Sequence, residues 1–285
     1  MSTPSTSHTS AGSPGTDPLA ALAALDGVPA AVDAVRAAVD RVYGHRVMRR
    51  RSAEVSAEAA LRGARASAAL AGADWGLEEV RRRTDFGADG EPRTVGAALR
   101  LNAEVGQLLG VWRQSPLRVL ARLHVVAGGS DGESVGRPRL AGEGVEDEKL
   151  PHPASYGLPA ADEVAARLEG LSELIVAGSQ APALVQAAVV HGELLALRPF
   201  TSYNALIARA AERLVLIGSG LDPKGICPAE VGHAELAEGY REALDGYLSA
   251  TPAGVAAWIA HCGRAVELGA RESAAVCEAL QRGAA

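Results

Sequence analysis

The stretch that decides the fold runs from Val189 to Arg209 and reads VVHGELLALRPFTSYNALIAR. Its first nine residues are mostly apolar and predict a buried helix. Pro199 lacks a backbone N–H and disfavours helical geometry at Arg198, so this helix is expected to end there. In the short polar loop that follows, Thr201 or Ser202 is expected to cap a second helix. The sequence therefore predicts two helices joined by a short loop.

The start of this second helix is a physically sensible place for an anion such as a phosphate. A helix N-terminus presents free N–H groups and the positive end of the helix dipole. Arg198 stands before it, and its fork-shaped guanidinium suits phosphate or carboxylate, although simple exposure at the surface explains it equally well. The helix N-terminus alone does not identify a ligand.

Outward from this stretch, apolar residues at helical spacing and capping signals predict helices through most of the chain. Strict apolar–polar alternation is too short anywhere to build a sheet, and only Val135–Leu140 suggests a small hairpin or a loop. We therefore expect an all-α bundle of eight or more helices with at most one small β-hairpin. The predicted helices are Val32–Met48, Ser52–Gly72, Thr94–Trp112 with Thr94 as N-cap, Pro116–Gly128, Ala160–Ala177, Ala183–Leu197, Asn204–Ile217, Pro228–Leu248 and Ala253–Leu280.

Composition excludes several functional classes. The 285 residues contain 28 Lys and Arg against 34 Asp and Glu, and a net charge of −6 argues against a protein that coats nucleic acid. The arginine runs at 49–51 and 81–83 are expected to be solvated helix ends. The sequence lacks an apolar run near the roughly 20 residues that a membrane helix needs. Partners are therefore expected to include neither nucleic acid nor a membrane.

The chain is expected to divide into three parts. Residues 1–18 are Ser, Thr, Pro and Gly with little to bury, which predicts a disordered tail. Residues 19–114 form an N-terminal helical region, and residues 115–285 form the core with the C-terminal helices. Three cysteines without C-x-x-C spacing, and no signal peptide, indicate a reducing cytoplasm. Cys227, Cys262 and Cys277 are expected to be small buried residues rather than metal ligands.

Residues 198–209, RPFTSYNALIAR, resemble the signature of the Fic (Fido) family, His-Pro-Phe-x-Asp/Glu-Gly-Asn-Gly-Arg-x-x-Arg, without a gap. Pro199, Phe200, Asn204 and Arg209 match, and the other defined positions differ. The resemblance implies a Fido-type helical bundle and, in active members, transfer of AMP or a related group from a nucleotide to a protein hydroxyl.

Other segments resemble the family in the same order along the chain. The helix 117–128 with His124 is similar to the one that precedes the family's target-binding flap. Residues 136–139, GRPR, resemble the flap's Gly-x-x-Arg, so Gly136, Arg137 and Arg139 are flap or target-binding candidates. Upstream, SAALAG resembles the family's inhibitory-helix motif Ser/Thr-x-x-x-Glu-Gly, with Ser67, Ala71 and Gly72 at its defined positions and Ala71 in place of glutamate.

The resemblance assigns two altered positions to the chemistry itself. Arg198 stands where the family has the histidine that takes the proton from the target hydroxyl, and a guanidinium stays protonated and has no acceptor lone pair. Ser202 stands where an acidic residue holds Mg²⁺, and a hydroxyl is a poor single ligand for a hard cation. Catalytic residues are therefore not assigned, and metal binding at the loop is expected to be weak.

The remaining changes affect phosphate binding. Tyr203 and Ala205 replace two glycines, and their Cβ atoms disfavour a nest of backbone N–H groups around a phosphate. Leu206 replaces the first motif arginine, which leaves Arg209 to meet a distal phosphate. The candidates for anion or nucleotide binding are thus Arg198, Asn204 and Arg209.

These changes predict a Fido-fold pseudoenzyme that is impaired in AMP transfer and acts by binding a protein partner or an anionic ligand. The alternative is a divergent transferase that uses another donor or a relocated base, such as His191 or Glu193. A third possibility is an antitoxin-like or scaffolding protein. Cofactors are not expected, except ATP with Mg²⁺ if the transferase alternative holds. The partner is unknown, an oligomer is possible, and the expected location is the cytoplasm.

Overall fold

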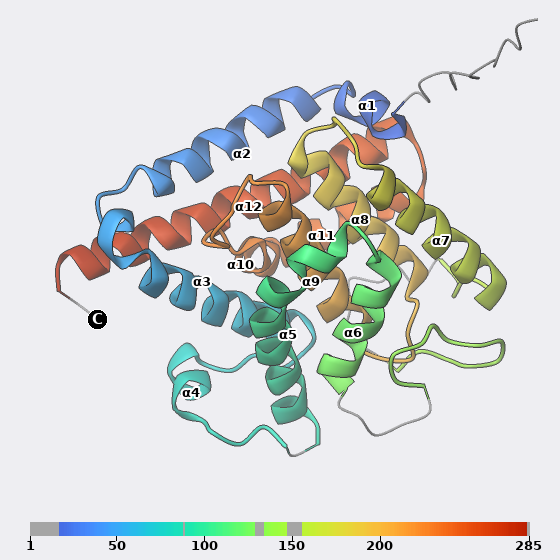
Figure 1. Cartoon of the computed structure of the whole chain (residues 1–285), viewed down its shortest axis with the longest axis horizontal. Coiled ribbons are helices and arrows are strands. Elements are labelled where there is room, and N and C mark those ends of the chain that lie inside the picture. Colours follow the sequence, from blue (N-terminus) through green and yellow to red (C-terminus); the bar gives the residue numbers. More distant parts are fainter. Residues whose placement is uncertain (1–16, 88, 129–133, 147–155, 284–285) are drawn as a thin grey trace, which may run out of the picture.

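The computed structural model describes residues 17–87, 89–128, 134–146 and 156–283, and these residues contain twelve α-helices and no strand (Figure 1). The predicted all-α class is confirmed. The segment 135–140 is a loop. Of the predicted tail, residues 1–16 lie outside the described part, whereas Asp17 caps the first helix and Pro18 begins it. The helices are α1 Pro18–Ala23, α2 Val28–Tyr43, α3 Met48–Leu70, α4 Leu77–Arg82, α5 Glu91–Trp112, α6 Pro116–Gly128, α7 Ala161–Ala177, α8 Ala183–Leu197, α9 Asn204–Gly218, α10 Ala229–Glu235, α11 Ala237–Leu248 and α12 Pro252–Gln281.

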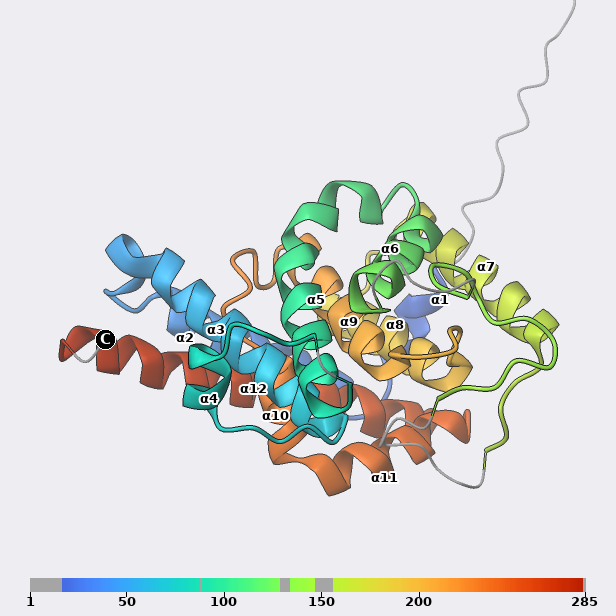
Figure 2. The same ribbon diagram turned by 90° about the horizontal axis from the view of Figure 1, so that it is seen from below.

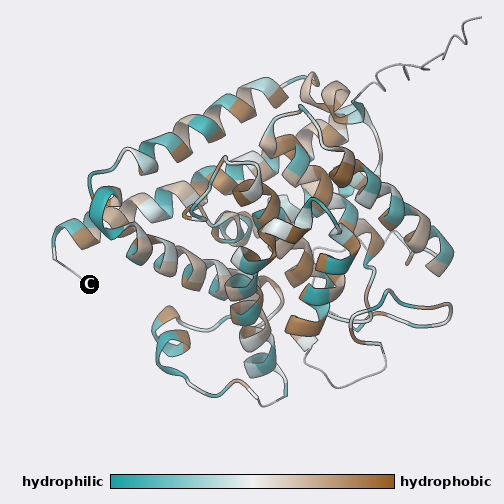
Figure 3. Ribbon diagram, in the orientation of Figure 1, coloured by the Kyte–Doolittle hydropathy of each residue, from teal (hydrophilic) through white to brown (hydrophobic). Residues whose placement is uncertain are grey.

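The antiparallel pair α8 and α9 forms the centre of the molecule. Twelve of the fifteen residues of α8 and thirteen of the fifteen residues of α9 are buried. Figure 3 shows α8 brown along much of its length, as expected for a helix covered on nearly all sides. Trp258 of α12 packs against α8, and its indole N–H donates to the carbonyl of Ala188 at 2.7 Å.

The other helices surround this pair in layers (Figures 1 and 2). The long helix α12 runs beside α2 and also packs against α8, α10 and α11, while α5 and α6 cover α9 and α3 lies against α5 and α10. A Cβ on Gly232 of α10 would lie 2.2 Å from the carbonyl oxygen of Ala265, so only glycine permits α10 to approach α12 this closely. This close approach places His233 of α10 against α12.

The prediction of a helix over Val32–Met48 is wrong at both ends. The helix begins four residues earlier, at Val28, and ends at Tyr43 before Gly44. Met48 instead begins α3, which has a kink at Arg51 (φ −123°, ψ 24°). The sequence separated the two helices but placed the boundary too late, because the apolar residues Val47 and Met48 extend the apolar pattern past Gly44.

Two further boundaries differ from the prediction. Thr94 is not an N-cap, because α5 begins at Glu91 after Gly90, whose φ of 80° suits glycine, and has a proline in its first turn. The segment 228–248 is two helices rather than one, interrupted at Leu236 (φ −107°, ψ 31°). The short helices α1 and α4 were not predicted, since six residues give too little periodicity.

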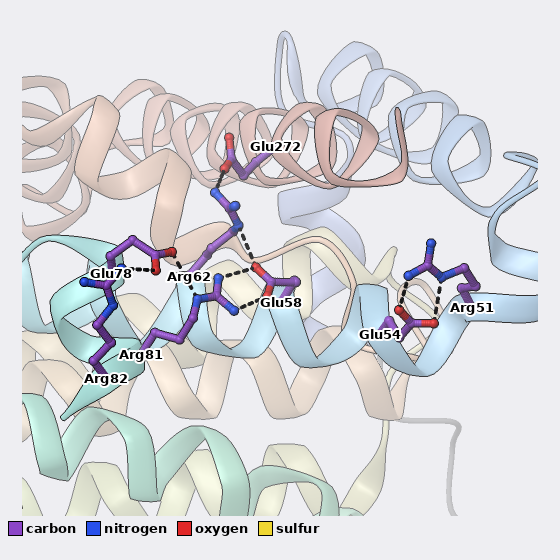
Figure 4. Close-up of polar contacts among 8 residues, drawn as sticks. All are labelled: Arg51, Glu54, Glu58, Arg62, Glu78, Arg81, Arg82 and Glu272. Atoms are coloured by element: carbon purple, nitrogen blue, oxygen red, sulfur yellow. Dashed lines mark hydrogen bonds and ion pairs between the residues drawn. The ribbon is translucent and has the colours of Figure 1, made fainter. Parts of the chain in front are cut away.

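Arginine–glutamate pairs connect α3 to α4 and α12 (Figure 4). Glu58 accepts two hydrogen bonds from Arg81, at 2.6 and 3.0 Å, and lies 3.4 Å from Arg62, which also pairs with Glu272 of α12. Each exposed pair contributes at most about 1 kcal/mol. Arg81, from the second arginine run, is thus engaged by acidic side chains. Over the described residues, the helices are too short or too polar for any to span a membrane.

Candidate functional site

Helix α8 ends in a left-handed turn at Arg198. This residue has φ 44° and ψ 64°, and its N–H donates to the carbonyl of Leu194 at 3.0 Å. Its guanidinium is half-buried, and Nη2 donates to the carbonyl of Gly157 at 3.2 Å. A cation at a helix C-terminus is favoured by the helix dipole. Arg198 therefore closes α8 and holds the segment before α7, and it offers no proton-accepting atom.

The side chain of Asn204 holds the loop in its conformation by hydrogen bonds to the backbone of Phe200. The side chain is 1% exposed, its Oδ1 accepts from the N–H of Phe200 at 2.8 Å, and its Nδ2 donates to the carbonyl of Phe200 at 2.9 Å. Both polar atoms of the amide are thus used within the chain. The ring of Phe200 packs on the imidazole of His124, with centroids 4.4 Å apart.

The prediction that Thr201 or Ser202 caps α9 is wrong. The N-cap is Tyr203, in a left-handed conformation (φ 58°), and its side chain does not cap the N–H groups of the helix. The bidentate bond of Asn204 already closes the turn and shifts the helix start past both hydroxyl residues. Thr201 instead donates from its hydroxyl to Ser134 Oγ at 3.2 Å. A positive φ is uncommon for a bulky residue, so Tyr203 holds a conformation that glycine would adopt more easily.

His124 joins the loop to the flap-like segment 134–146. Its Nδ1 accepts from the N–H of Gly136 at 3.1 Å, and its Nε2 lies 3.3 Å from Ser202 Oγ. Because Nδ1 accepts, the proton belongs on Nε2 and points to Ser202. Burial lowers the pKa of His124 to about 4, so the ring is neutral at pH 7. In this form His124 donates to Ser202 and cannot accept its proton.

The flap-like segment is fastened to the end of α8 by Arg139. This arginine is 4% exposed, its backbone N–H donates to the carbonyl of Pro199 at 2.8 Å, and its Nε donates to the carbonyl of Arg198 at 3.0 Å. Gly136 has φ 79°, which favours glycine. The predicted flap residues Gly136 and Arg139 therefore serve to position this segment on the loop.

The outer turn of the segment is held by Arg137. Its guanidinium donates to both oxygens of Glu143 at 2.8 Å, and this lowers the pKa of the Glu143 carboxyl to about 2. Glu143 also accepts from the N–H of Leu140. The turn leaves the Leu140 side chain pointing outward, with 56% of the residue exposed.

Arg209 is bound by the helix that the sequence singled out as inhibitory-like. The residue is 1% exposed, Nε donates to Ser67 Oγ at 2.8 Å, and Nη2 donates to the Ser67 carbonyl at 2.9 Å. Ala71 lies at the end of α3 and contributes only a methyl group, and Gly72 with φ 96° ends the helix. Ser67 therefore engages two of the three nitrogens of the guanidinium that the resemblance assigns to a distal phosphate, and the third, Nη1, is buried without a hydrogen-bond partner.

The two candidates for a relocated base lie apart from the loop hydroxyls. Both carboxylate oxygens of Glu193 accept from Nη2 of Arg167, at 3.1 and 2.9 Å, and Oε1 also accepts from the hydroxyl of Tyr247 at 2.8 Å. His191 is completely buried, and its Nε2 lies 2.7 Å from the hydroxyl of Tyr240. Burial lowers the pKa of His191.

Around His191 the structure brings together polar residues that sequence reasoning missed. Glu212, His233, Tyr240 and Cys262 come from four different helices and are all buried. Glu212 Oε2 lies 3.0 Å from a nitrogen of each of His191 and His233. The only signal in the sequence is the presence of Glu212 and His233 in otherwise apolar helical patterns.

Comparison with known proteins shows similarity at the level of structure. The sequence matches no family model and no curated protein. A Fic family protein from Desulfovibrio desulfuricans G20 superposes with a TM-score of 0.68 at 20% identity, over 86% of this chain and 74% of that one. Fic-1 from C. elegans gives 0.61 at 14% identity, over 88% and 72% of the two chains. A Fic domain-containing signaling protein from Bacteroides thetaiotaomicron VPI-5482 gives 0.62 at 12% identity, over 87% and 98%. The chain therefore has a Fic-like fold.

Proposed function

We propose that this chain is a Fic family member that is impaired in nucleotidyl transfer and acts by binding a protein partner. The observation that carries the proposal is the state of Arg209: the side chain needed for a distal phosphate is 1% exposed and donates to Ser67. Ser67 engages two of the three guanidinium nitrogens, and the third, Nη1, has no hydrogen-bond partner but is inaccessible to solvent. A phosphate could therefore reach Arg209 only by displacing the surrounding chain, which favours the protein alone over a nucleotide complex.

The chemistry of the loop also supports impaired nucleotidyl transfer. Arg198 stands at the position of the general base and has no lone pair with which to take a proton. Ser202 stands at the position of the metal ligand, and its hydroxyl accepts a hydrogen bond from neutral His124. Losing a positioned base typically costs roughly 10²- to 10⁴-fold in rate. Transfer is therefore expected to be negligible.

A protein is the better-supported ligand because the flap-like segment presents an apolar side chain while the anion candidates are engaged. Leu140 is 56% exposed on a turn held by the Arg137–Glu143 pair, and Arg139 fixes this turn to α8. A rigid turn with one protruding apolar side chain loses little entropy on binding. Free anions would instead have to displace Ser67 from Arg209.

The test is a transfer assay with labelled ATP, Mg²⁺ or Mn²⁺ and cell lysate. We expect no label on lysate proteins or on the chain itself, and Arg198→His alone is expected to remain inactive because Ser202 and Tyr203 are unchanged. Label that depends on the chain and disappears in Ser202→Ala would contradict the proposal and favour a divergent transferase. Ser202 is half-buried, and its Oγ lies 3.3 Å from His124 Nε2, so that variant is expected to fold.

A further inference from the structure

Four side chains with metal-binding chemistry meet in the core about two helical turns from the loop. His191 comes from α8, Glu212 from α9, His233 from α10 and Cys262 from α12. Each is at most 1% exposed, and one ligand atom from each lies within 4.8 Å of the others. Two imidazoles, a carboxylate and a thiol are a donor set that suits Zn²⁺.

The two imidazole rings are oriented in the way that metal-binding histidines usually are. His191 turns Nδ1 to Glu212 Oε2 at 3.0 Å while its Nε2 lies 2.7 Å from the Tyr240 hydroxyl. His233 turns Nε2 to the same oxygen at 3.0 Å while its Nδ1 lies 3.1 Å from His261 Nε2. Each ring therefore has one nitrogen toward the centre of the cluster and the other on an outer partner. Metal-bound histidines are usually held by such an outer hydrogen bond.

The protein atoms alone leave part of this cluster unsatisfied. His191 Nδ1 makes no hydrogen bond of acceptable geometry despite its 3.0 Å approach to Glu212, and Glu212 Oε1 has no hydrogen-bond partner. Both atoms are inaccessible to solvent, where an unsatisfied polar atom costs about 1–3 kcal/mol. A cation between these atoms would satisfy both at once.

Charge and distance are compatible with a closed site. Zn²⁺ with one carboxylate, one thiolate and two neutral imidazoles has no net charge, which reduces the penalty of burial. The buried Arg209 acts on His191 electrostatically and adds one positive charge to the surroundings. Metal–ligand bonds of about 2.0–2.3 Å place tetrahedral ligand atoms about 3.3–3.8 Å apart. The observed spread of up to 4.8 Å therefore requires the four side chains to close by about 1 Å.

We propose that His191, Glu212, His233 and Cys262 bind one Zn²⁺ in a closed tetrahedral site that joins α8, α9, α10 and α12. On binding, the Cys262 thiol gives its proton to solvent and the sulfur forms the bond to the metal. All four positions are filled by protein, so the site has no open position for substrate and its role is structural. The proposal is independent of whether the loop transfers a nucleotide.

The test uses cobalt as a spectroscopic substitute for zinc. The full-length chain, made without a polyhistidine tag in medium containing Co²⁺, meets the metal while it folds. We expect about one Co²⁺ per chain, the visible d–d bands of a tetrahedral site and a thiolate-to-cobalt charge-transfer band. The matched variants are Cys262→Ala and Cys277→Ala, which remove buried cysteines from the same helix.

The Cys277→Ala chain is expected to retain the charge-transfer band, and the Cys262→Ala chain is expected to lose it. If Cys262→Ala does not fold, Glu212→Gln, which keeps the side-chain shape, is expected to lower the cobalt content at least tenfold. A wild-type chain that folds without bound cobalt, or a charge-transfer band that persists in Cys262→Ala, would overturn the proposal.

Discussion

Two regions place polar side chains inside the apolar helical core: the loop between α8 and α9 with the adjacent Arg209, and the cluster around Glu212. They differ in how many of their polar atoms have hydrogen-bond partners. In the loop, the amide of Asn204 makes two hydrogen bonds with Phe200, and the guanidinium of Arg209 makes two with Ser67. In the cluster, His191 Nδ1 and Glu212 Oε1 have no hydrogen-bond partner. The protein itself thus satisfies the amide of Asn204 and two of the three guanidinium nitrogens of Arg209, and Arg209 Nη1 is buried without a hydrogen-bond partner. The cluster differs in that its two unsatisfied atoms are an imidazole nitrogen and a carboxylate oxygen, which are metal-ligand types.

The difference shows that a recognisable sequence pattern and an available site are separate properties. Pro199, Phe200 and Asn204 support a defined turn between two buried helices. The same contacts occupy the groups that a ligand would need. Substitutions in the two regions should therefore affect stability and binding to different degrees.

The largest effect is expected from Glu212→Ala. Removing one member of a buried charged network typically destabilises a protein by about 3–5 kcal/mol, because its partners remain buried without compensation. Urea unfolding measures this loss. Glu267→Ala is the control, since Glu267 forms a partly exposed pair with Arg264 on α12 and should change stability by less than about 1 kcal/mol. Equal effects of the two substitutions would contradict the account of the cluster.

A smaller loss is expected from Asn204→Ala. The substitution leaves the N–H and carbonyl of Phe200 buried without partners, which costs about 2–3 kcal/mol. Asn102→Ala is the matched control, because Asn102 donates only a long bond of 3.4 Å to the carbonyl of Ala98. If chemical denaturation shows the Asn204→Ala chain to be as stable as the control, the loop does not depend on this side chain.

Acid is expected to weaken the loop through His124. Its pKa is lowered to about 4 by burial, against an unfolded value near 6.5, so the unfolded chain binds a proton that the folded chain does not. This contribution is complete above pH 6.5 and is lost as the pH falls toward 4, by about 3 kcal/mol at most. Stability measured from pH 7.5 to 4.5 should fall less steeply in His124→Gln. Parallel curves for the two chains would show that His124 does not titrate as described.

The flap-like turn should give the smallest effect. Arg137→Ala removes a partly exposed pair with Glu143 and is expected to change global stability by at most about 1 kcal/mol. Amide exchange at Leu140 should become faster because Glu143 loses the arginine that orients it toward the Leu140 N–H. At about 1 M salt, where charges are screened within about 3 Å, the difference in the exchange rate of the Leu140 amide between Arg137→Ala and wild type should become smaller. Unchanged exchange would show that the turn is held by other contacts.

The sequence predicted the helical class and both ends of α8, because twelve buried positions and the Arg198–Pro199 step leave a strong local signal. It did not predict the left-handed cap at Tyr203 or the role of Asn204, since these depend on hydrogen bonds between loop atoms. The cluster was also missed. Its residues are 21, 21 and 29 positions apart and lie on four helices, so only the packing of α8, α9, α10 and α12 against one another brings them together.

Several expectations stay predictions: the boundaries of the three predicted parts, the roles of the site residues, cofactor and metal binding, the location in the cell and the identity of a partner. Helix packing connects both predicted helical parts, since α3 contacts α9 and α10, and α5 contacts α9, through one apolar core. Within that core, the Ser67–Arg209 bonds link the inhibitory-like helix to the loop helix. The Ser67–Arg209 contact is therefore the part of the loop that a nucleotide-binding experiment tests most directly.

Isothermal titration of the full-length chain with ATP and Mg²⁺ tests the central claim that the protein's own contacts occupy the loop. Because Arg209 is bound by Ser67 and Asn204 by Phe200, we expect no saturable heat and a dissociation constant weaker than about 1 mM, equivalent to about 4 kcal/mol of binding free energy. Saturable binding tighter than about 0.1 mM that is lost in Arg198→Ala would contradict it.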